Sequence, residues 1–264
     1  MGKLSRIKVD NGGHYLINDK KEPFFWLGDT AWQLFHRLTR EEAQEYFRIR
    51  SEQGFNVTQI VVLSEFNGIS SPNAYGDLPL INKDPSIINE KYFSFIDECI
   101  QMAADHSIYV VMLPTWGSNV IPPKGTGPAV FDEINARVFG DILGKRYGIY
   151  SNVLWMLGGD REVIHHRPVD TRPIWRAMAS GIADAAPDPF ITFHVTKGPH
   201  STSLSIHNEP WLSMNTMQSG HGLGRDVAVW EWIDRDYHML PTKPTLMRNK
   251  LRGPSDQSMA GLEP

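Results

Sequence analysis

Short runs of consecutive apolar residues recur along most of the chain, each followed by a polar loop and then by an amphipathic segment. Consecutive apolar residues are typical of strands buried on both faces of a sheet, and a 3.6-residue apolar period is typical of helices. A short hairpin is predicted first, over residues 7–9 and 14–17. The strands predicted after it cover residues 23–28, 57–63, 108–113, 153–157, 190–195, 212–217 and 243–246.

The segments between these strands predict the helices. Thr39 and Glu42 have capping-box spacing, so a helix is expected to begin after Thr39 and to end near Gly54. Further helices are expected over residues 88–104, 130–147, 171–186 and 225–239. Uninterrupted alternation of strand and helix predicts an α/β fold with parallel strands joined by helical crossovers.

Seven predicted strands favour a (β/α)8 TIM barrel over a doubly wound sheet. An eighth strand is not recognisable, so the barrel is expected to be incomplete at its C-terminal end. Residues 1–246 are expected to form this barrel together with its N-terminal hairpin, and residues 247–264 an atypical tail. An incomplete barrel would expose sheet edges, which a second copy of the chain could cover.

Composition narrows the range of partners. The 264 residues are 41% hydrophobic and carry a net charge of −4, so neither nucleic acid nor another polyanion is an expected partner. No apolar signal segment or 18-residue apolar run occurs, so we expect a soluble chain with no membrane partner. As written it would be cytoplasmic, or secreted or periplasmic if a signal has been removed. A single cysteine, Cys99, excludes an internal disulfide and a Cys-rich metal site.

Residues 153–160 carry the clearest chemical signal. The apolar run Val153–Leu157 is followed by Gly158 and Gly159, which let the backbone turn sharply, and then by Asp160. Barrel enzymes place catalytic groups just beyond the C-terminal ends of their parallel strands. Taken alone, the turn favours a simpler interpretation in which Asp160 caps the next helix, since Asp is a preferred N-cap residue.

Other predicted strand ends also carry polar or aromatic groups, which a barrel would gather with Asp160 at one rim. These are Asp29, Trp32, Glu65, Trp116, His194, Gln218 and His221. Carboxylates and neutral hydrogen-bonding groups suit the cleavage of a polyhydroxylated substrate, and aromatic rings stack on sugar faces. Singly, each has a structural explanation: Asp29 could cap a turn, His194 could be a satisfied core histidine and Gln218 could bond loop backbone.

Competing kinds of site have less support. A metal-dependent hydrolase needs several converging ligands, but the adjacent pair His165-His166 lies in a predicted loop and the other candidate histidines come from separate segments. We therefore expect no metal and no cofactor. The chain has no Gly-x-Ser-x-Gly elbow, and the turn at Leu27–Thr30 lacks the Gly-x-Gly-x-x-Gly phosphate loop.

Four segments carry a family resemblance. Glu22–Trp32, Gly54–Thr58, Trp155–Asp160 and Trp232–Tyr237 together resemble the apiosidase-like glycoside hydrolases, which are clan A (β/α)8 barrels. The resemblance implies retaining hydrolysis by two carboxylates, with the acid/base after strand four and the nucleophile after strand seven. The acid/base position falls on Asp160. Apiose is the sugar known for the family, but the loops of this chain contain no readable specificity code.

The second carboxylate of that pattern is missing. Asn249 occupies the place of the family's nucleophilic Glu, and Glu263 is the substitute that the tail offers. Shifting the reading frame by one base from Lys250 onward, with permitted codons, restores the family's Tyr-Glu-Asp-His-Pro. We therefore expect a divergent or frameshifted end from about Met247, and coding DNA unable to encode the shifted peptide would refute the frameshift.

The sequence thus predicts a glycosidase acting on plant or microbial oligosaccharide or polysaccharide. Asp160 would be its general acid/base, and Asp29, Trp32, Trp116, His194, Gln218 and His221 would bind the sugar. The alternative is a catalytically impaired sugar-binding barrel, which the missing Glu favours.

Overall fold

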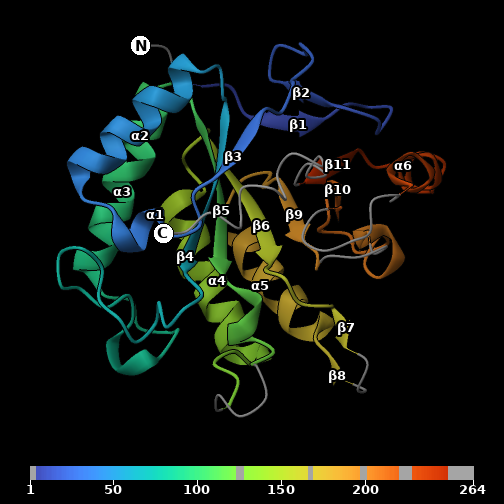
Figure 1. Ribbon diagram of the computed structural model, residues 1–264. Coiled ribbons are helices and arrows are strands. Elements are labelled where there is room, and N and C mark those ends of the chain that lie inside the picture. The colour runs from blue at the N-terminus through green and yellow to red at the C-terminus, as the bar shows by residue number, and fades with distance from the viewer. Residues whose placement is uncertain (1–3, 123–127, 166–168, 197–200, 220–227, 249–264) are drawn as a thin grey trace, which may run out of the picture.

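Five parallel strands form the central sheet of the computed structural model, which describes residues 4–122, 128–165, 169–196, 201–219 and 228–248 (Figure 1). Their order is β3-β4-β5-β6-β9. The strands are β3 Gly28–Thr30, β4 Val57–Leu63, β5 Tyr109–Thr115, β6 Val153–Gly158 and β9 Ile191–His194. Sequence order and spatial order agree, as expected for consecutive βα units of a barrel.

Two more parallel strands, β10 Asn215–Gln218 and β11 Thr245–Arg248, continue this order. The segment that leads into β10 is bonded to β9: the Ser213 amide donates to the Ile191 carbonyl at 2.7 Å, and the Thr192 hydroxyl donates to the Met214 carbonyl at 2.7 Å. Seven strands therefore curl in barrel order among the described residues. This confirms the prediction of an incomplete α/β barrel.

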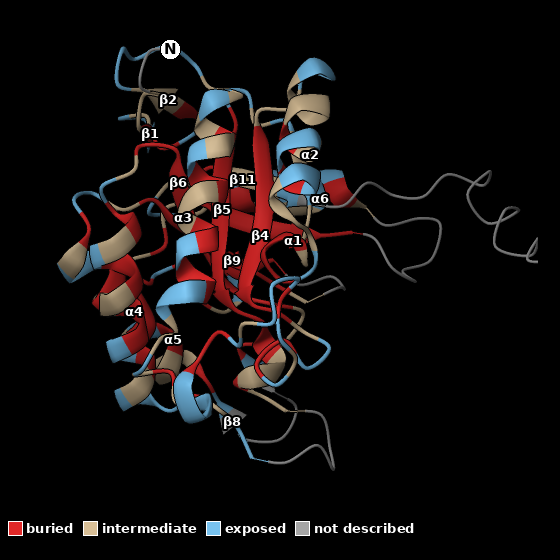
Figure 2. Cartoon of the chain, turned by 90° about the vertical axis from the view of Figure 1, so that its left-hand side faces the viewer, coloured by how far each residue is buried: buried red, intermediate tan, exposed pale blue. Residues whose placement is uncertain are grey.

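Helices cover the outer face of the sheet, with their buried sides toward the strands and their exposed sides toward solvent (Figure 2). They are α2 Arg40–Glu52, α3 Glu90–Asp105, α4 Glu133–Tyr147 and α5 Arg172–Ala185. The short helix α1 Leu34–Arg37 follows β3, and α6 Val229–Tyr237 lies beside β11 (Figure 1). The capping box of α2 is confirmed, because the Thr39 side chain accepts from the Glu42 amide and the Glu42 carboxylate accepts from the Thr39 amide.

The remaining elements are short. Antiparallel hairpins are formed by β1 Ile7–Val9 with β2 Leu16–Asn18, and by β7 Ile164–His165 with β8 Val169–Asp170. Single 3-10 turns are η1 Ile81–Lys83, η2 Gly117–Asn119 and η3 Thr202–Leu204. His165 therefore lies in a short strand and not in the loop that the sequence predicted.

Glycines let α4 and α5 approach closely. A Cβ at Gly140 would lie 2.3 Å from the Met178 carbonyl oxygen, and one at Gly181 would lie 2.2 Å from the Arg137 carbonyl oxygen. No side chain larger than hydrogen fits at either position, so these two helices pack backbone to backbone.

The N-terminal hairpin closes one end of the barrel. Ile7 and Leu16 pack with Val57, Tyr109 and other residues that point into the barrel interior. The Tyr109 hydroxyl also donates to the Ser5 carbonyl at 2.6 Å. Side chains therefore fill this end, and the C-terminal ends of the strands, where barrel enzymes place their catalytic groups, lie at the opposite end.

The predicted strand over residues 23–28 is wrong in position, since β3 begins only at Gly28. The preceding residues bond elsewhere: the Phe25 carbonyl and the Leu27 amide are paired with the side-chain amide of Asn56 at 2.7 and 2.9 Å. Pro23 has no amide hydrogen to contribute to a ladder. Separately, none of the helices in the described ranges is long and apolar enough to cross a bilayer.

Candidate functional site

The turn after β6 has an unusual backbone. Gly158, Gly159 and Asp160 all have positive φ, at 88°, 129° and 51°. A Cβ at Gly158 would lie 2.5 Å from the His194 carbonyl oxygen, and one at Gly159 would lie 2.5 Å from the Gly117 amide nitrogen. The glycines thus let the chain turn where two neighbouring loops leave no room. Asp160 itself adopts the left-handed conformation, which aspartate and asparagine tolerate better than most other residues.

The capping interpretation of Asp160 is wrong. Helix α5 begins only at Arg172, with Thr171 at its N-cap position. The Asp160 side chain is 42% exposed and lies beside the almost fully buried ring of His194, with Oδ1 3.7 Å from Nδ1. The turn therefore presents the carboxylate at the strand ends.

Gln218 at the end of β10 also contacts Asp160. With its amide oriented to suit its neighbours, Gln218 Nε2 donates to Asp160 Oδ1 at 3.0 Å and to the Val195 carbonyl at 2.9 Å. His194 Nδ1 lies 3.0 Å from the same Val195 carbonyl, so Nδ1 carries the ring proton. These contacts bring together three side chains that the sequence placed at separate strand ends, namely Asp160, His194 and Gln218.

Two tryptophan rings lie beside His194 at the same strand ends. The ring centroids of Trp32 and Trp116 lie 5.3 Å apart, and each ring lies within 5.3 Å of the His194 ring. Trp116 is only 4% exposed, so its ring supports the wall of the site and does not form an open platform. Trp32 is half-buried.

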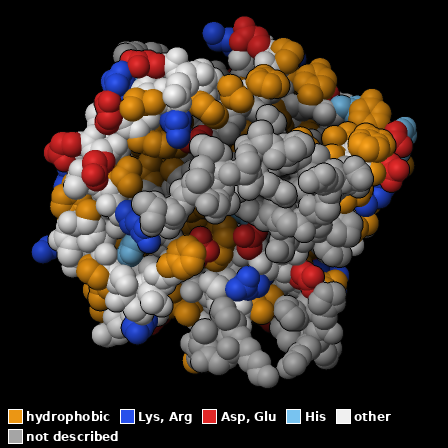
Figure 3. Space-filling model, in the orientation of Figure 1, with side chains coloured by type: hydrophobic (Ala, Val, Ile, Leu, Met, Phe, Trp, Pro, Cys, Tyr) orange, Lys and Arg blue, Asp and Glu red, His pale blue; other side chains and the backbone are white. Residues whose placement is uncertain are grey.

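A second carboxyl group, Glu65, lies at this rim just beyond β4. Partial burial raises the pKa of Glu65, the negative charge of Asp160 raises it further, and the positive charge of Arg161 lowers it. Arg161 is held by two carbonyls, those of Asp160 at 3.0 Å and Ile121 at 3.3 Å. Figure 3 shows acidic side chains near the centre of the face that is in view, next to a basic side chain.

Asp29 is not brought into this cluster. Its carboxylate accepts hydrogen bonds from the Tyr46 hydroxyl at 2.9 Å and from Arg50, both on α2. Alternate residues of a strand point to opposite faces, and Asp29 lies on the face toward the helices. The sequence prediction for Asp29 used only its position at a strand end, and that position does not determine the face to which the side chain points.

The Asp29→Asn substitution should therefore affect stability and not sugar recognition. Removing the carboxylate charge that pairs with Arg50, whose side chain is 32% exposed, is expected to lower the free energy of unfolding by about 1–2 kcal/mol. Urea unfolding measures this. Glu52→Gln, which breaks a more exposed pair with Arg48, serves as a control with little expected change. A weaker sugar affinity at unchanged stability would contradict the assignment.

Two predicted site residues, His221 and Glu263, lie outside the described residues. Within the described ranges no three His, Cys, Asp or Glu side chains are grouped so that they could hold a metal ion.

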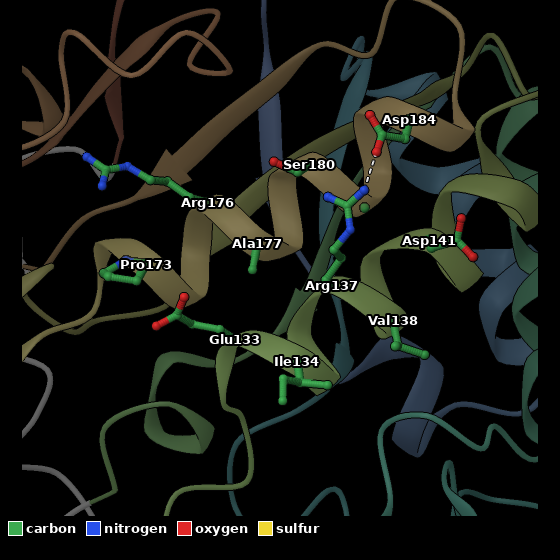
Figure 4. Close-up of a pocket in the computed structure, with 11 residues that line it drawn as sticks. Glu133, Ile134, Arg137, Val138, Asp141, Pro173, Arg176, Ala177, Ser180 and Asp184 are labelled. Carbon is green, nitrogen blue, oxygen red and sulfur yellow. Dashed lines mark hydrogen bonds and ion pairs between the residues drawn. The ribbon is translucent and has the colours of Figure 1, made fainter.

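A separate hollow of about 780 Å³ lies between α4 and α5 on the outer helical layer (Figure 4). An ion pair between Arg137 and Asp184 joins the two helices there. This hollow lies away from the strand ends and contains none of the residues that the sequence singled out.

Sequence reasoning gave no role to Gln33 and Arg161. Gln33 follows Trp32 in a loop, and its Nε2 donates to the Glu65 carbonyl at 3.4 Å. Arg161 follows Asp160 directly in the sequence, and this adjacency was the one local indication that it lies at the same site. Glu65 was recognised as a rim residue, but its electrostatic relation to Asp160 depends on the curvature of the sheet.

Comparisons with known proteins agree with the fold. A family model described as "Apiosidase-like, catalytic domain" matches residues 10–249. A glycoside hydrolase family 5 structure from Bacteroides vulgatus ATCC 8482 is 29% identical, with a TM-score of 0.80, over 92% of this chain and 54% of that one. A structure described as "Glycoside hydrolase" is 30% identical, with a TM-score of 0.78, over 91% of this chain and 55% of that one.

A more distant likeness extends the comparison of the fold. An endo-1,4-beta-mannanase from Rhizomucor miehei is 12% identical, with a TM-score of 0.63, over 91% of this chain and 80% of that one. The chain spans about half the length of the two more similar structures. A search of curated proteins gives no match.

Proposed function

Because the chain belongs to the family of Apiosidase-like catalytic domains, we propose that it is a glycosidase that cleaves O-glycosidic bonds in plant or microbial polysaccharide. One observation carries the proposal. The strained turn after β6 presents the Asp160 carboxylate at the strand ends, beside His194 and Gln218. Barrel enzymes carry out their chemistry at this end, and glycosidases do so with carboxyl groups.

Asp160 is the general acid/base in this proposal. In its protonated form it donates a proton to the glycosidic oxygen as the bond to the leaving group breaks, and as a carboxylate it then accepts a proton from the attacking water. The Gln218 amide, which donates to Asp160 Oδ1, stabilises the carboxylate formed by the first step. Trp32 and the supporting Trp116 offer an apolar wall for a sugar ring.

The second carboxylate separates two versions of this function. A retaining glycosidase needs a nucleophile after the seventh strand, β11, and Asn249 follows that strand in sequence. If another group acted as the nucleophile, the chain would hydrolyse glycosides. If no group did, it would bind sugars without cleaving them.

Assays of the full chain separate these versions. Aryl glycosides and plant cell-wall oligosaccharides are tested for hydrolysis, and the same oligosaccharides for binding by calorimetry. Turnover supports the enzyme, whereas saturable binding without turnover supports the impaired barrel. If neither hydrolysis nor binding occurs with any sugar, the proposal is refuted.

Asn249→Glu tests the missing nucleophile directly. We expect turnover of aryl glycosides to rise at least about tenfold, because a carboxylate at this position can form the covalent intermediate. Asn249→Gln is the matched control, since it has the same length without the charge. Equal turnover in the two variants would show that position 249 does not supply the nucleophile.

A further inference from the structure

Phe66 follows Glu65 at the rim of the site, and its side chain is 73% exposed. Its φ of 56° lies in the left-handed region, where a bulky apolar residue is strained. The other non-glycine residues with positive φ in the described ranges are all polar. Neither the backbone conformation nor burial of the ring therefore accounts for a phenylalanine at this position.

The turn that carries Phe66 is held on both sides. After it, the Ile69 side chain is only 7% exposed and packs in the hydrophobic core. Before it, the Glu65 carbonyl accepts a hydrogen bond at 3.4 Å from Nε2 of Gln33, the residue that follows Trp32. The exposed ring thus stands on a turn that is fixed to the core and to the loop after β3.

The same turn lies at the rim that carries Asp160. The Trp116 amide after β5 donates to the Leu63 carbonyl at the end of β4 at 3.0 Å, and the charge of Asp160 acts on Glu65, the residue before Phe66. Adjacent strands lie about 4.8 Å apart, so the ends of β4 and β6 are separated by about 10 Å. A single sugar ring at Asp160 does not span this distance, whereas an oligosaccharide does.

Other aromatic rings at the rim offer less open surface. Trp116 is 4% exposed and Trp32 is half-buried. Figure 3 shows hydrophobic side chains beside the acidic ones near the centre of the face in view. A single exposed apolar side chain is common on protein surfaces, so exposure alone does not indicate a site. At Phe66 exposure coincides with an unfavourable backbone and a place at the strand ends, and an open aromatic face suits stacking on the apolar face of a sugar ring.

We propose that Phe66 is an outer sugar position of this site, at which its ring stacks on one sugar of an oligosaccharide whose scissile bond lies at Asp160. The ligand class is then a chain of several sugars and not a single sugar with a small leaving group. The position of the scissile bond rests on the proposed glycosidase function. The stacking at Phe66 requires only that the chain binds sugars.

Phe66→Ala tests the outer sugar position, with cellohexaose, xylohexaose and mannohexaose as probes in calorimetry of the full chain. We expect the affinity for the hexaose that the parent binds to fall roughly three- to tenfold, and Phe66→Trp to retain it. Phe25→Ala is the matched control, because Phe25 is 77% exposed and precedes β3, at the opposite end of the strands. An affinity that is the same in Phe66→Ala as in the parent overturns the proposal.

Phe66→Asn distinguishes sugar binding from a structural role. Asparagine is favoured in the left-handed region and little burial is lost, so the urea midpoint should rise while the affinity falls as in Phe66→Ala. A lower urea midpoint with unchanged affinity would assign Phe66 a structural role and contradict the proposal.

The outcomes separate the outer sugar position from the glycosidase function. Binding that depends on Phe66 in a chain without turnover would count against the glycosidase and not against Phe66. Hexaose hydrolysis with equal kcat/KM in the parent and Phe66→Ala would support the glycosidase and overturn the role of Phe66. In an active chain, aryl monoglycosides should be cleaved equally by both, because they do not reach Phe66. A parent chain that binds none of the three hexaoses would refute the outer sugar position.

Discussion

Replacing Asp160 with asparagine is expected to lower kcat/KM for glycosides with poor leaving groups by roughly 10²- to 10⁴-fold. The amide cannot donate a carboxylic proton to the departing oxygen or act as a base toward water. A good leaving group needs little protonation, so aryl glycosides with acidic phenols should lose much less in the bond-breaking step. Measuring kcat/KM across a series of leaving groups tests both expectations.

The control for Asp160→Asn must make the same substitution at a residue with a similar positive φ. Asp160 has φ of 51°, and asparagine is favoured in that region, so the variant could gain stability for reasons unrelated to chemistry. Asp188 is exposed and has φ of 46°, so Asp188→Asn makes the same change away from the site. Activity that is equally retained in both variants would remove Asp160 from the mechanism.

Gly159→Ala should destabilise the protein by roughly 2–4 kcal/mol and disrupt the site. Alanine at φ of 129° is strained, and its Cβ would lie 2.5 Å from the Gly117 nitrogen and 2.9 Å from the Trp116 ring. The loops after β5 and β6 would have to separate, which would displace Asp160 from His194 and Gln218. Urea unfolding and calorimetric sugar binding measure the two effects.

A substitution at a second glycine distinguishes the cost of backbone strain from the cost of steric overlap. Gly76 also has positive φ, at 83°, but a Cβ there would meet nothing within 4 Å. Gly76→Ala should therefore cost only the backbone strain, about 1–2 kcal/mol, and leave sugar binding unchanged. If Gly159→Ala were no worse than Gly76→Ala, the tight contact between the β5 and β6 loops would be refuted.

Much of the fold was predictable from the sequence because buried parallel strands have a strong local signature. The run Val57–Leu63 is apolar apart from Thr58 and Gln59, and its strand bounds were predicted without error. The strand at residues 23–28 failed because Pro23 and the Asn56 side chain direct the backbone bonding of that segment. Asn56 lies in another part of the chain, so no local pattern reports the contact.

For the site, the sequence determined which chemical groups follow the strands. Gly158-Gly159-Asp160 after an apolar run is a local feature, and it identified the residue on which the proposed chemistry depends. The direction of each side chain was decided by the tertiary structure. Asp29 points to Tyr46 and Arg50 on α2, whereas His194 and Gln218 point to Asp160. The electrostatic effect of Asp160 on Glu65 likewise needs three strands side by side, because the effect of a charge depends on distance in space and not on separation along the chain.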